Sequence, residues 1–206
     1  MEYLTYDFRH AQEILATRPE WTALDTVIRA VTREEVIETH NAIAEQAGRA
    51  PAGGQSAINQ VFRTRLIPLG WESEPRLFQE TDEGLRRWKM DFIRGRVGVE
   101  VSFNHAEAVP WTFTRLNIAG ESEKVIEEHR IDVGVALFAT EKLKQWARMD
   151  SAVGTYELAC VWLQMMRPIM PIPILVVGLE PDGWPSTDVF RGTIQRNREK
   201  SDLPDD

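Results

Sequence analysis

The sequence predicts a single α/β domain in which helices pack around a mixed β-sheet. The chain has 206 residues, of which 43% are hydrophobic and 27% charged, a composition typical of one globular core. Helical periodicity dominates before Gly70, whereas alternating or continuous apolar segments follow it and are separated by further helical patterns. This order favours helices followed by an antiparallel hairpin and then by strands that alternate with helices.

The N-terminal part is expected to contain two main helices. Thr32 followed by Glu35 forms a capping-box pattern, which predicts a helix over residues 32–47. After a Gly- and Pro-containing loop, apolar residues at 3.6-residue spacing predict a second helix over 58–69. A shorter helix is expected near residues 8–16.

A β-hairpin is expected next, with strands at 85–93 and 96–103 and a turn at Arg94-Gly95. In the second strand, valines alternate with Gly98, Glu100 and Ser102, a period of two that gives one apolar face and one different face.

The remaining elements alternate in type. Their expected ranges are a mixed segment over 111–128 with no single assignment, a strand over 131–138, a helix from Thr140 to residue 148, a helix over 155–166 and a buried strand over 172–179. Residues 1–180 are expected to form the domain. The polar, acidic composition of 181–206 predicts a partly disordered tail.

Composition excludes several classes of protein. The net charge of −8 argues against attraction of nucleic acid to the whole surface, although basic residues gather between residues 86 and 96. No apolar run is long enough to span a membrane, and the N-terminus has no signal-peptide pattern. Cys160 is the only cysteine, which excludes an intrachain disulfide and a multi-cysteine zinc site. We therefore expect a cytoplasmic protein with no membrane partner.

Asp91 and Glu100 are the residues most suggestive of chemistry. A turn at Arg94-Gly95 would place Asp91 opposite Gly98 and diagonal to Glu100, at about 7–8 Å between backbones. Two carboxylates at that separation can hold one hard cation, and Gly98 would leave room for the ion or a phosphate. Alternatively, both are surface acids on the solvent-exposed face of an antiparallel sheet.

The segment Met90–Asn104 resembles the active-site hairpin of the BglII/BstYI type II restriction endonucleases, which belong to the PD-(D/E)xK nuclease superfamily. Further segments before and after the hairpin also match, and they occur in the family's order along the chain. The resemblance therefore covers roughly residues 55–180. The matching segments are Ile58–Arg63 with Leu69–Trp71, Ile131–Val135, Ser151–Glu157 and Met170–Leu179.

The resemblance implies a Mg²⁺-dependent nuclease, with Mn²⁺ as a substitute. Asp91 and Glu100 match the two metal-binding acids, and the backbone carbonyl of Val101 matches the third metal contact. Ser102 stands where the superfamily has lysine and this branch has glutamine, which puts in doubt how the attacking water is oriented. An upstream acid that some superfamily members add to the metal site would be Glu45, although a solvated helix glutamate is the favoured interpretation of this residue.

The resemblance also implies a homodimer that cuts palindromic double-stranded DNA in a prokaryotic cell. Candidates for phosphate contacts are Lys89, Arg94 and Arg96. Candidates for base contacts are Asn104, His105 and Ser151.

Three alternatives stay open at this stage. Ser102 is compatible with a DNA-binding protein on the same fold that cleaves weakly or not at all. A nuclease for repair or junction DNA would lack sequence preference. A metal-free globular protein with a chance resemblance would show no metal-dependent stabilisation.

Overall fold

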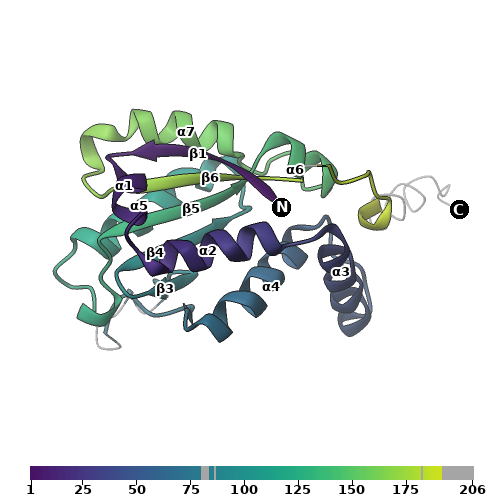
Figure 1. Cartoon of the computed structure of the whole chain (residues 1–206), viewed down its shortest axis with the longest axis horizontal. Helices are drawn as coiled ribbons and strands as arrows, with labels where there is room; N and C mark the ends of the chain where they lie inside the picture. Colours follow the sequence, from purple (N-terminus) through teal and green to yellow (C-terminus); the bar gives the residue numbers. More distant parts are fainter. Residues whose placement is uncertain (80–83, 86, 182, 192–206) are drawn as a thin grey trace, which may run out of the picture.

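A six-stranded mixed sheet forms the centre of the protein and is covered by helices on both faces (Figure 1). The computed structural model describes residues 1–79, 84–85, 87–181 and 183–191. The strands are β1 (Glu2–Phe8), β2 (Glu72–Ser73), β3 (Phe92–Arg94), β4 (Val97–Ser102), β5 (Val133–Ala139) and β6 (Ile174–Glu180). Their order across the sheet is β1-β6-β5-β4-β3-β2. The neighbouring strands β4, β5 and β6 are parallel, and the outer pairs are antiparallel.

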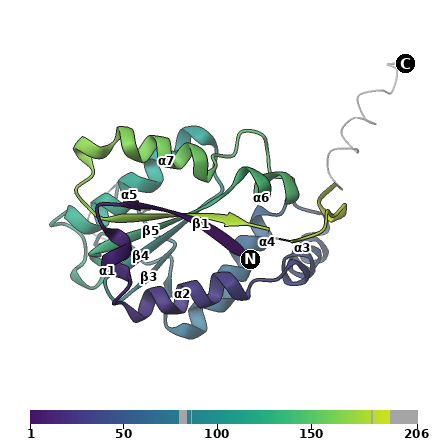
Figure 2. The same cartoon turned by 45° about the horizontal axis from the view of Figure 1, so that its top comes forward.

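The α-helices lie between the strands in the chain. They are α1 (Ala11–Leu15), α2 (Pro19–Ala30), α3 (Arg33–Ala47), α4 (Gln55–Leu66), α5 (Val109–Glu121), α6 (Glu141–Trp146) and α7 (Tyr156–Met165). Helices α5 and α7 cover one face of the sheet, while α2 and α4 lie on the other (Figure 2). Among the described residues, no helix is long and apolar enough to cross a membrane.

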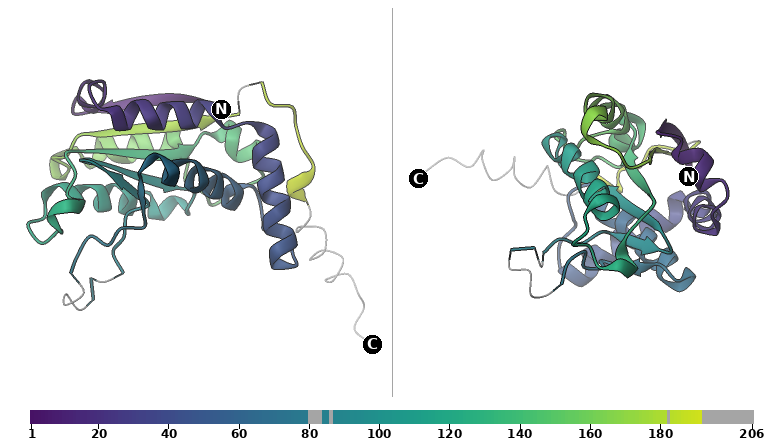
Figure 3. Two further views of the ribbon diagram at one scale, coloured as in Figure 1. Left: turned by 60° about the horizontal axis from the view of Figure 1, so that its bottom comes forward. Right: turned by 90° about the vertical axis from the view of Figure 1, so that its left-hand side faces the viewer.

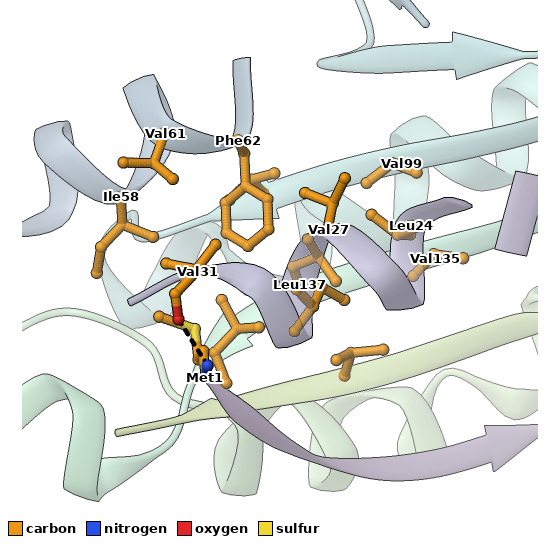
Figure 4. Close-up of a cluster of buried hydrophobic side chains, with 14 of the residues drawn as sticks. Met1, Leu24, Val27, Val31, Ile58, Val61, Phe62, Val99, Val135 and Leu137 are labelled. Atoms are coloured by element: carbon orange, nitrogen blue, oxygen red, sulfur yellow. Dashed lines mark hydrogen bonds between the residues drawn. The ribbon is translucent and has the colours of Figure 1, made fainter. Parts of the chain in front are cut away.

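The core is split into two layers by the sheet because successive strand residues point to opposite faces. On the α2 and α4 side, Leu24, Val27 and Phe62 pack against Val99 of β4 and Val135 of β5 (Figure 4). On the other side, residues of α5 and α7 pack against the alternate residues of the same strands, including Ala136 and Phe138. The central strands are therefore covered on both faces, as parallel strands generally are.

Most elements predicted after residue 30 are confirmed with small shifts in their ends. The Thr32 side chain accepts a hydrogen bond from the Glu35 backbone at 3.2 Å and so caps α3, while the Glu35 carboxylate binds Arg65. Helix α4 begins earlier than expected and ends at Leu66, where Pro68 lies in a short 3-10 turn, Ile67–Leu69. Strands β4, β5 and β6 and helices α6 and α7 occupy their expected places.

Several predictions near the sheet edges are wrong or incomplete. The strand expected over 85–93 is confined to β3, and the described residues before Phe92 form turns and an isolated bridge between Arg76 and Lys89. Helix α5 occupies most of 111–128, for which no single element was expected. Strand β1 and helix α2 are also additional to the predicted elements.

The register of the hairpin differs from the prediction. Gly95, with φ of 55°, makes the turn one residue later than expected, so that Phe92 pairs with Val99 rather than with Val97. Gly98 therefore lies opposite Ile93 and does not provide space for an ion. A Cβ at Gly98 would lie 2.5 Å from the Met90 Sδ and 2.9 Å from the Ile131 Cδ1. This glycine permits close packing.

The described part of the C-terminal segment packs against the domain (Figure 3). Phe190 is buried and its ring contacts His40 of α3, while Trp184 contacts Trp146 of α6. The partly disordered tail expected over 181–206 is therefore packed on the domain where it is described, at residues 183–191, while residues 182 and 192–206 lie outside the described residues.

Candidate active site

Asp91 and Glu100 come together where β3 meets β4. Continuing the observed register by one residue from Phe92 and Val99 places Asp91 beside Glu100. The Asp91 Oδ2 accepts a hydrogen bond of 2.7 Å from the backbone N–H of Val101. The carboxylate of Asp91 is therefore fixed against the main chain of the residue that follows Glu100.

Both carboxyl groups lie in surroundings that oppose their ionisation. Glu100 has an exposed fraction of only 1%, because β4 is covered on both faces. Burial and then the charge of Asp91 raise the pKa of Glu100 well above its usual value, while Arg115 acts in the opposite direction. Burial also raises the pKa of Asp91, although the Val101 N–H and Arg115 partly compensate. Glu100 is therefore not an acid on a solvent-exposed face, and that interpretation of the sequence is wrong.

Arg115 of α5 provides the positive charge nearest to Glu100. Its Nη2 lies 2.7 Å from the Glu100 Oε2. Within the described part of the chain, neither Glu100 carboxylate oxygen nor the buried Arg115 Nε has a partner with hydrogen-bond geometry. Buried polar atoms without such partners are uncommon, so this cluster has unused capacity to bind a further group.

The donor set fits a hard divalent cation. Mg²⁺ prefers oxygen ligands and is commonly held by one or two carboxylates, with water and substrate phosphate completing the coordination. Asp91, Glu100 and the Val101 carbonyl would supply such oxygens. The described residues contain no group of three or more His, Cys, Asp or Glu side chains that could hold a metal, so a site built only from such ligands is not present among them.

Ser102 is buried on the same face of β4 as Glu100. Its Oγ accepts a hydrogen bond of 3.0 Å from the Thr112 hydroxyl of α5, one turn before Arg115. Two successive residues on this face of β4 are therefore held by one side of α5. The Ser102 hydroxyl keeps its own proton for donation to another acceptor.

A pocket of about 320 Å³ opens beside Asp91. The lining residues are Ser56, Asn59, Gln60, Arg63, Ser73, Glu74, Asp91, Phe92 and Val101. Glu100 is not among them, whereas Asp91, whose carboxylate is bound by the Val101 N–H, is. The site thus has a buried side at α5 and an open side at α4.

Acids and bases balance around this site. Glu74 binds Arg63 at 2.9 Å and Lys89 at 3.1 Å. The resulting set of three acids and three bases is Glu74, Asp91 and Glu100 with Arg63, Lys89 and Arg115. The pocket side is consequently not dominated by negative charge even without a metal.

The predicted phosphate-binding residues occupy different places. Lys89 lies near the pocket through its contact with Glu74. Arg94 is half-buried at the end of β3. Arg96 lies at the start of β4, away from the Glu100 end, and binds Asp132 at 3.1 Å and Glu127 at 3.2 Å.

The predicted base-contact segments meet after the end of β4. His105 forms an isolated antiparallel bridge with Val153, and the Asn104 carbonyl accepts a hydrogen bond from the Gly154 N–H at 2.9 Å. Asn104, His105 and Ser151 are all exposed. Two segments far apart in the sequence therefore form one surface beyond the strand that carries Glu100.

Sequence patterns alone did not identify Arg115, Thr112, Arg63 or Glu74. Each comes from an element whose position depends on tertiary packing. Glu45, the predicted upstream acid, is exposed on α3 and is not among the residues that line the pocket. Glu74 is the acid that lies beside Asp91. Its backbone has a left-handed φ of 56°, an unusual conformation that marks functional sites but is visible only in a structure.

Comparisons with known proteins identify the family of this chain and agree with its fold. The family model described as Restriction endonuclease BglII/BglIII matches residues 3–179. The crystal structure of restriction endonuclease BglII complexed with a DNA 16-mer is similar, with a TM-score of 0.67 and 19% identity over 88% of this chain and 79% of that chain. Free BglII gives a TM-score of 0.55 and 18% identity over 88% and 81% of the two chains. No curated protein matches the sequence.

Proposed function

Because the chain belongs to the restriction endonuclease BglII/BglIII family, we propose that it is a Mg²⁺-dependent type II enzyme that hydrolyses phosphodiester bonds in palindromic double-stranded DNA. The observation that carries this proposal is the pair of half-buried Asp91 and buried Glu100, whose surroundings oppose the ionisation of both carboxyl groups. We expect Mn²⁺ to replace Mg²⁺.

Asp91, Glu100 and the Val101 carbonyl would hold the metal. A bound Mg²⁺ would polarise the scissile phosphate, make hydroxide available at neutral pH and stabilise the leaving oxygen. The Val101 N–H fixes Asp91, and Arg115, at 2.7 Å from Glu100, favours the ionised form of Glu100 against the effect of burial. Ser102, oriented by Thr112, is the candidate for orienting the attacking water through its free proton.

The same proposal assigns the DNA contacts and the assembly. Lys89, Arg94 and Arg96 are candidates for phosphate contacts, and Arg96 would have to exchange its acidic partners for phosphate. The surface formed by Asn104, His105 and Ser151 is the candidate for contacts to bases.

A homodimer would place one active site on each strand of a palindromic site. Exposed apolar side chains on the adjoining helices α5 and α7 support an interface there. Trp111 is 60% exposed and Met165 is 66% exposed. Such an enzyme would act in the cytoplasm of a prokaryotic cell.

Cleavage and metal binding can be tested separately. We expect the full-length protein to convert plasmid DNA into discrete fragments with Mg²⁺ or Mn²⁺, and to do nothing in EDTA. Asp91→Asn and Glu100→Gln should each abolish cleavage, whereas Glu121→Gln, an exposed acid at the end of α5, should cleave normally. Mg²⁺ should raise the melting temperature of the wild type but not that of Glu100→Gln.

Ser102 supports one second candidate, a protein on the same fold that binds DNA without cutting it. DNA binding in Ca²⁺ without cleavage in Mg²⁺ or Mn²⁺ would favour that candidate. Recovery of cleavage in Ser102→Gln or Ser102→Lys would then identify Ser102 as its cause. Absence of both DNA binding and metal-dependent stabilisation would refute the proposed function.

A further inference from the structure

We propose that the pocket beside Asp91 binds a phosphate group of the DNA strand to be cut, with Arg63 of α4 as its ligand and Glu74 holding Arg63 in place before DNA arrives. This inference rests on the proposed function and adds to it the side chains that position the strand.

One side of α4 is built as a polar surface facing the pocket. Ser56, Asn59, Gln60 and Arg63 recur at helical spacing along this side and all line the pocket. The opposite side of α4 carries Ile58, Phe62 and Leu66, which are buried in the core. The helix is therefore fixed by its apolar side, and its polar side is held rigidly at the site.

The chemistry of this surface suits a sugar-phosphate backbone. Proteins contact phosphates through Arg and Lys and through neutral Ser, Asn and Gln side chains, and the pocket offers Arg, Ser, Asn and Gln together. Its volume of about 320 Å³ lies within the range of small-molecule sites, about 300–1,000 Å³, and so has room for part of a nucleotide. Asp91 lines the same pocket, which places the bound phosphate next to the proposed metal.

Glu74 is positioned by its main chain. Its backbone adopts φ of 56°, a left-handed conformation that is unfavourable for a residue other than glycine. Its N–H donates a hydrogen bond of 3.0 Å to the Asp91 carbonyl. The carboxylate is thereby carried to the rim of the pocket, where it contacts Arg63 and Lys89.

The contacts of Glu74 can exchange. Side chains of Arg63, Glu74 and Lys89 are 45%, 47% and 43% exposed, so each ion pair is weak and screened by water. A phosphate can accept two parallel hydrogen bonds from a guanidinium and is therefore a strong competitor for Arg63. Glu74 thus binds Arg63 in the free protein and acts as a placeholder, that is, a carboxylate that the DNA phosphate replaces on Arg63.

Arg65 offers a matched control on the same helix. Its Nε and Nη2 bind the two oxygens of Glu35 on α3 at 2.8 and 2.9 Å, and it does not line the pocket. Arg65→Gln therefore removes the same charge from α4 as Arg63→Gln without touching the proposed phosphate site.

The test measures binding of full-length variants to a DNA fragment that the wild type cuts. Binding is measured in Ca²⁺ between about 50 and 200 mM salt, and cleavage is measured in Mg²⁺. We expect Arg63→Gln to raise Kd about tenfold and to reduce the slope of log K against log salt by about 1, because one phosphate contact is lost. Arg65→Gln should match the wild type in both. Circular dichroism and melting temperature establish that each variant is folded.

Glu74→Gln tests the placeholder role. Glutamine keeps the shape of the side chain but removes the negative charge that competes with phosphate for Arg63. The Kd for DNA should therefore fall about threefold at low salt. The Mg²⁺-induced rise in melting temperature should be unchanged. Loss of that rise would make Glu74 a metal ligand and would overturn the role assigned here.

The outcomes separate this inference from the proposed function. If the wild type cuts DNA and Arg63→Gln equals Arg65→Gln in Kd and salt slope, the phosphate pocket is wrong while the nuclease stands. If the wild type neither binds nor cuts DNA, the proposed function fails and this inference fails with it.

Discussion

Replacing Arg115 by methionine should lower the free energy of unfolding, because the charge of the buried Glu100 carboxylate then has no positive partner. The two side chains are 2.7 Å apart, with Glu100 1% and Arg115 32% exposed. Breaking a fully buried pair by removing one partner costs about 3–5 kcal/mol. Because a third of Arg115 is exposed and water can reach that end, we expect a smaller loss of about 2 kcal/mol at neutral pH. For a domain of this size that corresponds to a fall of about 4–8 °C in melting temperature.

The loss should depend on pH in a definite direction. The pKa of Glu100 is raised in the folded state, so ionisation of this carboxyl destabilises the fold as the pH rises above the unfolded value. Below about pH 4 the group is protonated in both states and Arg115 has little charge to compensate. Arg115→Met should therefore approach wild-type stability in acid and diverge from it as the pH rises.

Thermal unfolding in EDTA, followed by circular dichroism across this pH range, measures the effect. Arg130→Met is a matched control, because Arg130 is 30% exposed but pairs at 3.7 Å with an acid that is 77% exposed. It should lose less than about 1 kcal/mol. The reasoning is refuted if both variants lose the same stability at pH 8, or if Arg115→Met is equally destabilising when Glu100→Gln is already present.

Two further changes test the core and a buried histidine. Phe62→Ala should reduce the free energy of unfolding by about 3–5 kcal/mol in urea titration, because Phe62 is fully buried between α4 and the sheet; a loss below 1 kcal/mol would contradict this packing (Figure 4). Burial lowers the pKa of His40, which is 1% exposed, so the fold should lose stability as the pH falls below about 6.5. His40→Phe should remove that part of the pH dependence, and an unchanged pH profile would show that His40 does not cause it.

The faces of the hairpin could be predicted although its register could not. Moving the turn by one residue shifts the pairing of Phe92 from Val97 to Val99, a shift of two, and side chains of a strand alternate with a period of two. Asp91 and Glu100 were therefore predicted correctly as neighbours, and the structure brings them closer than the diagonal arrangement. The role of Gly98 depended on the exact register, and for that reason its prediction was wrong.

Partners contributed by other elements could not be predicted from local patterns. Arg115 and Thr112 reach β4 only because α5 packs across that face of the sheet, and the sequence pattern of 111–128 did not define the helix. Strand β1 lies at the sheet edge, and its seven residues are mostly exposed or half-buried, so the apolar alternation of a core strand is weak there. Thr32 and Thr140, in contrast, cap their helices through contacts within one turn, which sequence spacing captures.

Pairing of Arg63, Lys89 and Arg96 with acids suggests how a chain of net charge −8 can be suited to DNA. Arg63 and Lys89 share Glu74, and Arg96 is bound by Asp132 and Glu127. In the free protein these bases create little positive field, so the surface as a whole does not attract DNA. A DNA phosphate that displaces one of these acids binds a guanidinium or ammonium group that is already in position. The displaced carboxylate is then hydrated by water. Attraction is thereby confined to the places where phosphates fit, and binding should depend on the shape of the duplex at the site more than on the total charge of the protein.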